Sequence, residues 1–487
     1  MKPTSIRRNL IVCCFLFFQV GFAQQNNDSI SSQFSSERIP NDQSSDTAFS
    51  LVISSVSISG NKKTHPKIIL RELPFKIGEE LTVSAKEMSD ILKKAQQLIY
   101  NTNLFSSVSL ALTSNDSTQI VLLISVTERL YFYPVPQFRL IDRNFNEWWE
   151  TYDADLNRTI YGIRFIHNNL SGAADKLSIT AMNGYFRSFS IGYSNPYLNP
   201  SLSKGLGVVV GFSQKREFPY ATTNNNKLVL YRFPSFQNSN FTSSVIYQIR
   251  KGLYNRHFFQ LQYNQIQWPD SFTYYHPGFV NSAANSTSFA DVSYTYQHLN
   301  LDNINYPLRG KAYAVSIANR GLGFQKGLNM STFEMSYRKY FQQKKYNFAI
   351  QLFSKIKVPF KQSYLNQRML GYGDLYLRGL EYYVIDGVVA GLAKSTISKK
   401  VLSMNVPLPF RINQISSIPI KSYLKAFADA GYVRQANNYH SELNNRFLYS
   451  GGLGIDLLSL YDFQLGIDYS INQLGERGFF LHTRGFF

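Results

Sequence analysis

From Tyr131 to the end of the chain, apolar and polar residues alternate in segments of about ten residues. Side chains of a strand point alternately to opposite faces of a sheet, so this pattern predicts many strands with one apolar face each. Strands of this length cross a lipid bilayer when they are tilted. The clearest segments are 259–264, 346–358 and 463–472, the last with Phe463, Leu465, Ile467, Tyr469 and Ile471 between polar or small residues.

Two classes of exported β-protein fit such a pattern, a soluble sandwich and an outer-membrane barrel. The chain has 38 Phe and 33 Tyr, yet its mean hydropathy is slightly below zero. Alternating membrane strands average out to such a value, whereas the strands of a sandwich are usually shorter. Counting gives sixteen or seventeen strands. We predict a mostly β fold with a 16-stranded transmembrane antiparallel β-barrel over residues 129–487, because closure leaves no strand edge in lipid.

Residues 1–23 have the pattern of a cleaved signal peptide. Basic residues precede a short apolar run, and Gly21-Phe22-Ala23 offers a small-x-small cleavage site. The run is too short for a spanning helix, and an uncleaved anchor is the alternative. Both cysteines, Cys13 and Cys14, lie in this segment, so the mature chain is expected to have none. Residues 24–49 are rich in Ser, Asn and Gln, which predicts a disordered tether.

The formal net charge of the chain is +19. Nucleic-acid-binding proteins concentrate their basic residues in patches, whereas here Lys and Arg are dispersed over strands and loops. We therefore expect no nucleic-acid partner. The phosphate groups of outer-membrane lipids are the expected partners of this charge.

Residues 50–128 predict a small α+β domain with the order β-α-α-β-β. Its first strand ends in a turn at Gly60 and Asn61, and Gly78 lies in the loop between the helices. Thr82 or Ser84 is the expected cap of the second helix.

Leu104 and Phe105 are expected to end the second helix of this domain and to pack against a three-stranded sheet. The phrases VSISGNKKTHPKIILRELPFKIGEELT and NTNLFSSVSLAL resemble a POTRA domain. A generic α+β sandwich of the same order is the alternative.

The segment 359–394 is long for a loop in a compact barrel, and such loops are usually functional or disordered. Its core, LRGL at 377–380, resembles the Arg-Gly loop motif of the BamA/TamA outer-membrane assembly superfamily. The second motif of that family is matched by FADAG at 427–431. The family prefers a β-branched residue before the arginine and an aromatic residue after the glycine, and this chain has leucine at both positions.

The resemblance implies a lock between this loop and the barrel wall. The loop would fold into the lumen, where the buried cation of Arg378 needs the carboxylate of Asp429. Gly379 and Gly431 would let the two backbones approach, with Phe427 beside them. A solvated surface arginine is the alternative.

Three further phrases are similar to the same family. DNINYPLRG at 302–310 resembles the entry to a barrel strand, and NNLSG at 168–172 resembles an early barrel turn. The chain ends in GFFLHTRGFF, in which Phe479, Leu481 and Phe487 resemble the C-terminal β-signal of outer-membrane proteins.

No catalytic set is recognisable in the sequence. The seven histidines show no metal-ligand spacing, and no nucleophile elbow or phosphate loop is present. We expect no enzyme activity, no metal and no cofactor.

The resemblance implies a protein of the Gram-negative outer membrane, with its POTRA domain in the periplasm. It would assist the insertion, assembly or translocation of outer-membrane proteins, and strands 107–112 and 120–126 would capture client strands by β-augmentation. The first and last barrel strands would form a weak seam. A single POTRA domain favours an accessory, TamA-like role. A transport barrel or channel for lipid or a dedicated passenger, and a structural surface-antigen barrel, remain alternatives, as do accessory lipoprotein subunits.

Overall fold

The computed structural model describes residues 48–484, apart from 115–118, 142–152, 277–278, 280–284, 324–327, 374, 413–414 and 437–440. The predicted signal peptide, all but the end of the predicted tether, and Phe487 lie outside these residues. No helix among the described residues is long and apolar enough to cross a membrane.

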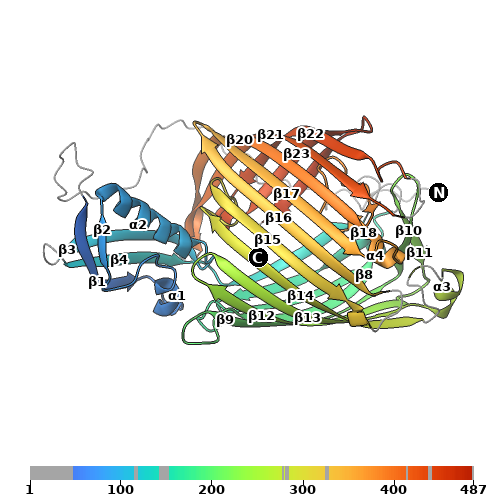
Figure 1. The fold of residues 1–487 in the computed structure, drawn as a ribbon, viewed down its shortest axis with the longest axis horizontal. Helices are drawn as coiled ribbons and strands as arrows, with labels where there is room; N and C mark the ends of the chain where they lie inside the picture. The colour runs from blue at the N-terminus through green and yellow to red at the C-terminus, as the bar shows by residue number, and fades with distance from the viewer. Residues whose placement is uncertain are drawn as a thin grey trace, which may run out of the picture. The chain divides into compact units, whose positions relative to one another are not determined.

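The N-terminal domain contains one strand that the sequence pattern did not predict. Its elements are β1 (Phe49–Ser59), α1 (Pro66–Leu70), β2 (Glu80–Val83), α2 (Ala85–Tyr100), β3 (Phe105–Ser114) and β4 (Gln119–Glu128). The sheet has the order β2-β1-β4-β3, so it is four-stranded rather than three-stranded (Figure 1). Strand β2 has only four residues, too few for a period to be recognised, and it contains Thr82. Ser84 caps α2 and forms a capping box with Glu87.

The sheet order corrects one of the predicted capture strands. Strand β4 contains residues 120–126 and pairs with β1 on one side and β3 on the other. Its backbone groups are already used, so it cannot accept a further strand. Strand β3 lies at the edge and keeps one side free of a partner strand within the described residues.

The predicted turn and packing residues of this domain lie as follows. Gly60 has φ +87°, and a Cβ there would lie 1.9 Å from the carbonyl oxygen of Val126. The side chain of Asn61 donates to the carbonyl of Thr64 at 3.1 Å, and Gly78 has φ +81°. Leu104 and Phe105 are buried in the core of the domain, as expected, but they do not end the second helix, because α2 ends at Tyr100 and Phe105 begins β3.

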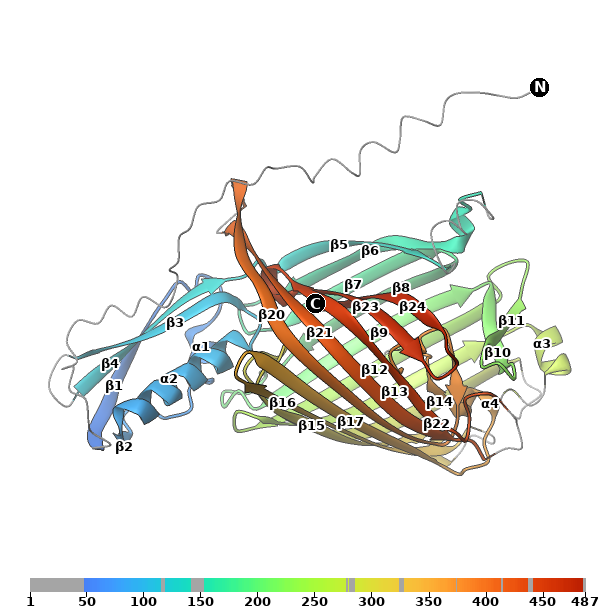
Figure 2. The same ribbon diagram turned by 90° about the horizontal axis from the view of Figure 1, so that it is seen from above.

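Sixteen antiparallel strands form the second sheet, as predicted. Figure 2 shows β20 and β21 projecting past the strands beside them. In chain order, which is also their order in the sheet, the strands are β5 (Phe132–Leu140), β6 (Thr159–Asn168), β7 (Lys176–Gly184), β8 (Phe186–Asn195), β9 (Lys204–Lys215), β12 (Asn238–Lys251), β13 (Asn255–Gln267), β14 (Ser286–Leu301), β15 (Gly310–Arg320), β16 (Met330–Gln343), β17 (Tyr346–Val358), β20 (Val389–Ile412), β21 (Ile415–Arg434), β22 (Phe447–Leu458), β23 (Gln464–Asn472) and β24 (Arg477–Arg484).

The strands of this sheet are apolar on the outside and polar on the inside. In β23, Ile467, Tyr469 and Ile471 are exposed, whereas Asp468 and Ser470 between them are buried. A soluble protein would bury the apolar set, because water is its solvent. The reversed arrangement is the one that suits a wall between lipid and a polar lumen.

The longer connections carry short elements of their own. The hairpin β10 (Glu217–Thr222) and β11 (Leu228–Arg232) follows β9, and helix α3 (Asp270–Tyr275) follows β13. Their aromatic side chains pack into one cluster around Phe272, which is fully buried. The connection between β17 and β20 contains α4 (Tyr364–Gln367), β18 (Arg368–Leu370) and β19 (Ile385–Asp386).

Candidate functional site

Residues 359–388, here called the inner loop, join β17 to β20 and pack against the inner side of the sheet. Six of its apolar residues form one hydrophobic cluster with residues of the wall strands and their connections. The flanking leucines Leu377 and Leu380 are both buried in it. The cluster contains Met369, Leu370, Leu377, Leu380, Tyr383 and Ile385 from the inner loop, and Ala390, Leu392, Val433, Leu443 and Leu448 from the wall and its connections.

Arg378 and Asp429 meet as a two-point ion pair. Nη2 lies 2.5 Å from Oδ1 and Nε lies 2.9 Å from Oδ2, and the backbone N–H of Arg378 donates to Oδ2 at 3.2 Å. The remaining guanidinium donors reach Thr396 Oγ1 at 3.0 Å and the Ser395 carbonyl at 3.1 Å. The Asp429 side chain is fully buried, so both charges depend on each other for compensation.

The ring of Phe427 packs against the guanidinium group of this ion pair. The Arg378 guanidinium lies 4.0 Å from the centre of the Phe427 ring, a distance at which a cation is attracted to the ring face. The ring is accommodated by a glycine of β22, because a Cβ on Gly452 would lie 2.7 Å from Phe427 Cζ.

The two motif glycines lie where chains approach closely. Gly379 has φ +86°, and a Cβ there would lie 3.1 Å from the Cβ of Ser470. A Cβ on Gly431 would lie 2.6 Å from Leu392 Cδ2 and 3.2 Å from Leu377 Cδ1. Gly431 therefore makes room for the leucine that stands before Arg378.

A second set of buried charges connects four strands beside this pair, and sequence reasoning missed it. Lys425 Nζ on β21 lies 2.7 Å from Asp456 Oδ1 on β22 and 2.7 Å from Asp468 Oδ1 on β23. His482 on β24 continues the set, with Nδ1 3.4 Å from Asp468 and Nε2 3.4 Å from Glu381 of the inner loop. Ionisable residues at inward positions of membrane strands are the signal that would have found it.

The predicted strand entry at 302–310 reaches the same charges. Asp302 accepts from the backbone N–H groups of Leu308 and Arg309, which shapes the turn, and Gly310 begins β15 with φ +111°. Tyr306 in this turn donates to Asp456 Oδ2 at 3.1 Å. The Tyr-Pro motif therefore ties the β14–β15 turn to the buried charges.

The inner loop also holds the last hairpin of the sheet. Asn472 Nδ2 donates to the Gly379 carbonyl at 2.8 Å, and Tyr383 Oη donates to Glu476 at 2.5 Å. Glu476 lies in the turn between β23 and β24. The hydrogen bond from Tyr383, followed by that from Asn472, holds the pKa of Glu476 below its usual value.

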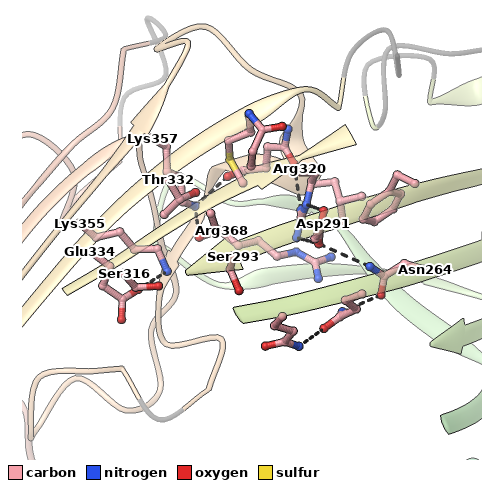
Figure 3. A pocket seen from close by; sticks show the side chains of 18 of the residues that line it. Asn264, Asp291, Ser293, Ser316, Arg320, Thr332, Glu334, Lys355, Lys357 and Arg368 are labelled. Carbon is pink, nitrogen blue, oxygen red and sulfur yellow. Dashed lines mark hydrogen bonds and ion pairs between the residues drawn. The ribbon is translucent and has the colours of Figure 1, made fainter. Parts of the chain in front are cut away.

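Beside strands β12 to β17, the first part of the inner loop borders a polar cavity of about 490 Å³ (Figure 3). Lys357 Nζ donates to the Asn366 carbonyl at 2.7 Å, and Arg320 Nη1 donates to Asn366 Oδ1 at 3.0 Å. Arg320 also pairs with Asp291 at 3.3 Å. The polar side chains of β13 to β17 thus face an inner space that can hold water.

The first and last strands of the sheet, β5 and β24, each pair with a single neighbour strand within the described residues. Strand β5 contains Pro134 and Pro136. A proline fits a paired strand when its nitrogen faces away from the neighbour, and alternate positions place both nitrogens on the same side. The free edge of β5 therefore lacks two N–H donors, which weakens any ladder formed there.

Two residues of the predicted β-signal lie on β24. Phe479 and Leu481 are highly exposed on the outer face, at 74% and 67%. The third, Phe487, is outside the described residues. On the inner face of the same strand, His482 makes the contacts given above.

The N-terminal domain is matched by a family model. Residues 51–129 match POTRA, described as surface antigen variable number repeat. The chain carries a POTRA domain. Among curated proteins, none matches the chain.

Several solved structures are similar to most of the chain at low identity. BamA from Haemophilus ducreyi lacking POTRA domains 1-3 is 13% identical, with 90% of this chain and 85% of that chain covered and a TM-score of 0.48. CdiB from Acinetobacter baumannii is 14% identical, covering 89% and 73%, with a TM-score of 0.47. CdiB from Escherichia coli is 9% identical, covering 92% and 92%, with a TM-score of 0.49. Likeness at this level carries no functional argument, and the architecture rests on the strands of this chain.

The POTRA match and the 16-stranded sheet support the BamA/TamA-like assignment that the sequence motifs indicate. They also support the outer membrane as the location, with the POTRA domain in the periplasm.

The POTRA domain contacts the end of β12 through a buried ion pair. Glu72 Oε1 and Oε2 each lie 2.6 Å from a guanidinium nitrogen of Arg250, at the end of β12. Tyr197 Oη accepts from Arg250 at 2.8 Å. Both charged side chains are almost fully buried, so separating the domain from the barrel would leave them uncompensated.

Proposed function

We propose that this protein assists the insertion, assembly or translocation of other outer-membrane proteins. The observation that carries the proposal is the free edge of β5, which two prolines leave short of donors at the start of the barrel. Such an edge forms few hydrogen bonds with β24, so little free energy is needed to separate the two strands. A client strand could then add to the freed edge of β24, whose backbone donors no proline removes.

The POTRA domain is proposed to deliver clients by β-augmentation on β3. This strand is ten residues long and lies at the edge of its sheet, so it offers a ladder of backbone groups. Strand β2 at the other edge has four residues and offers little.

The test is a disulfide between the end strands. Since both cysteines lie at positions 13 and 14, engineered cysteines are the only ones in the mature chain if the signal peptide is removed. Val135→Cys is combined with single cysteines from Phe479 to Thr483, and the pair that cross-links is used. Insertion of a client barrel into liposomes should stop when this disulfide forms and return on reduction.

The matched control is a disulfide across an ordinary pair of wall strands, Leu453→Cys with Tyr469→Cys, which face each other on β22 and β23. It should leave insertion unchanged. Equal insertion with and without the end-strand disulfide would contradict the proposal. In cells, depletion should lower many outer-membrane barrels; unchanged barrels with one missing passenger or altered lipid asymmetry would contradict an assembly role.

A transport barrel is the second candidate, and the polar cavity beside β13 to β17 favours it. Planar-bilayer recordings separate the two. An assembly barrel filled by its inner loop should give no steady conductance, whereas a channel should give uniform current steps.

A further inference from the structure

The hairpin of β20 and β21 is longer than the wall to which it belongs. Strand β17 pairs with β20 only as far as Lys399, and β22 pairs with β21 only as far as Lys421. The two strands nevertheless continue to pair with each other to Pro407 and Ser417, and close at Ile412 and Ile415. We call residues 400–407 and 417–420 the ribbon.

The ribbon lies at the POTRA end of the barrel. Strand β5 begins at this end, directly after the POTRA domain. Because successive strands are antiparallel, every second turn of the sheet lies at the same end as the start of β5. The β20–β21 turn is one of these, like the turns after β14 and β16. The ribbon therefore extends into the periplasm, by about 13 Å along β21, where residues 417–420 add four residues at a rise of about 3.3 Å each.

The ribbon has one apolar and one polar face. A bulge between Lys400 and Leu402 changes the register, after which Leu402, Met404 and Val406 lie opposite Ser422, Ile420 and Ile418. The opposite face carries Ser403, Asn405 and Pro407 against Lys421, Pro419 and Ser417. Leu402 and Met404 are about half exposed, at 46% and 47%.

The apolar face of the ribbon continues the lipid-facing side of the barrel. On β21, Lys425 points inward to Asp456, and Leu424 points outward and is exposed. Ile418 and Ile420 share the even positions of Leu424, so they lie on the outward face. A ribbon bent outward at the bulge would lay this face on the membrane surface.

The charge of the hairpin suits an anionic surface. Residues 387–428 contain no Asp or Glu, and Lys399, Lys400 and Lys421 lie where the neighbouring strands end. Lysine near the edge of the hydrocarbon extends its amine to lipid phosphates.

We propose that the ribbon is a membrane-surface foot, which rests on the periplasmic leaflet of the outer membrane and binds anionic phospholipid. The two edges of the ribbon could also pair with a strand of another protein. Such pairing uses backbone groups alone, so it would not explain why the apolar face of the ribbon continues the lipid-facing side of the barrel. The proposal rests on the outer-membrane location and is independent of the insertion activity. A foot of this kind fixes the depth and tilt of the barrel on one side.

The test compares two adjacent positions on opposite faces. Met404→Cys and Asn405→Cys are labelled with an environment-sensitive fluorophore in the full-length protein, in vesicles of phosphatidylethanolamine and phosphatidylglycerol. The label at 404 should be quenched by spin-labelled lipid and shielded from aqueous iodide, and the label at 405 should show the reverse. Equal access of iodide to both positions would overturn the proposal.

Two further measurements test the contribution of charge to lipid binding and the identity of the molecule that the ribbon contacts in cells. Replacing Lys399 with Gln should weaken the lipid contact about fivefold in vesicles with phosphatidylglycerol and much less without it. A photo-crosslinker at position 404 in cells should capture lipid, and capture of a protein instead would overturn the proposal. Unchanged heat-modifiable mobility of each variant in gels verifies that the barrel is folded.

Discussion

The sheet is held together differently along β20 to β23 and at its two ends. Along β20 to β23, the inner loop adds an ion pair, a hydrophobic cluster and close glycine contacts to the ordinary strand ladder. A buried ion pair between Lys425 and Asp456 joins β21 to β22 as well. At the ends, β5 lacks two donors on its free edge, and β24 is joined to the inner loop by side chains. The strands β20 to β23 are thus held firmly together, whereas the weakest pairing of the sheet is expected between its end strands, β5 and β24.

The largest expected effect comes from breaking the pair between Arg378 and Asp429. Arg378→Ala and Asp429→Ala should each cost about 3–5 kcal/mol of stability, because each leaves a buried charge unpaired. The double variant should cost little more than one of them, and urea unfolding in detergent measures all three.

The matched control for this prediction is Arg309→Ala. Arg309 also precedes a glycine, but it is exposed and bonds to Gln342. Its replacement should cost less than about 1 kcal/mol. Additive effects of Arg378→Ala and Asp429→Ala would show that the two residues act separately.

Leu377→Ala should cost about 2–5 kcal/mol, because it empties a fully buried site between the inner loop and Gly431. The same unfolding measurement applies. Leu424→Ala removes a leucine that faces lipid and serves as the control. A loss no greater than that of the control would mean that the leucines of the motif do not anchor the loop.

Replacing Pro134 and Pro136 with Val should strengthen the pairing between the end strands β5 and β24. Two restored N–H donors would allow two more hydrogen bonds to β24, worth about 1 kcal/mol each. Cross-linking of the end strands should become more efficient and client insertion slower. Faster insertion would place the weakness of the seam elsewhere.

The smallest expected effect is that of Tyr383→Phe, about 1 kcal/mol for one hydrogen bond. The lowered pKa of Glu476 means that this contact stabilises the folded state above the usual glutamate pKa of about 4.3. The contribution should fade as the pH falls through the lower folded value. Unfolding midpoints of the wild type and Tyr383→Phe should therefore differ at pH 7 and converge in acid.

The barrel and the inner-loop contact were accessible from the sequence because both have local signatures. Alternation marks each strand separately, and the motifs at 377–380 and 427–431 name two segments that turn out to touch. The charges around Lys425 appear in the sequence only as single ionisable residues at inward positions of separate strands, and this pattern does not tell which of them meet. Asp456, Asp468 and His482 meet only because the register of four strands places them on one face, and no single segment contains that information.

Two local predictions for the N-terminal domain failed for related reasons. Strand β2 depends on pairing with β1, not on its own four residues, so its sequence resembles a loop. The central place of β4 follows from its parallel pairing with β1, which the order of elements along the chain does not reveal.

The contacts of the inner loop also set an order of events during the protein's own assembly. Arg378 meets Asp429, which follows it by 51 residues, and Glu381 meets His482 in the last strand. The loop can settle only after all five strands that follow it have taken their places. A chain that stops before β21 or β24 would therefore leave the half-buried Arg378 or Glu381 without its partner.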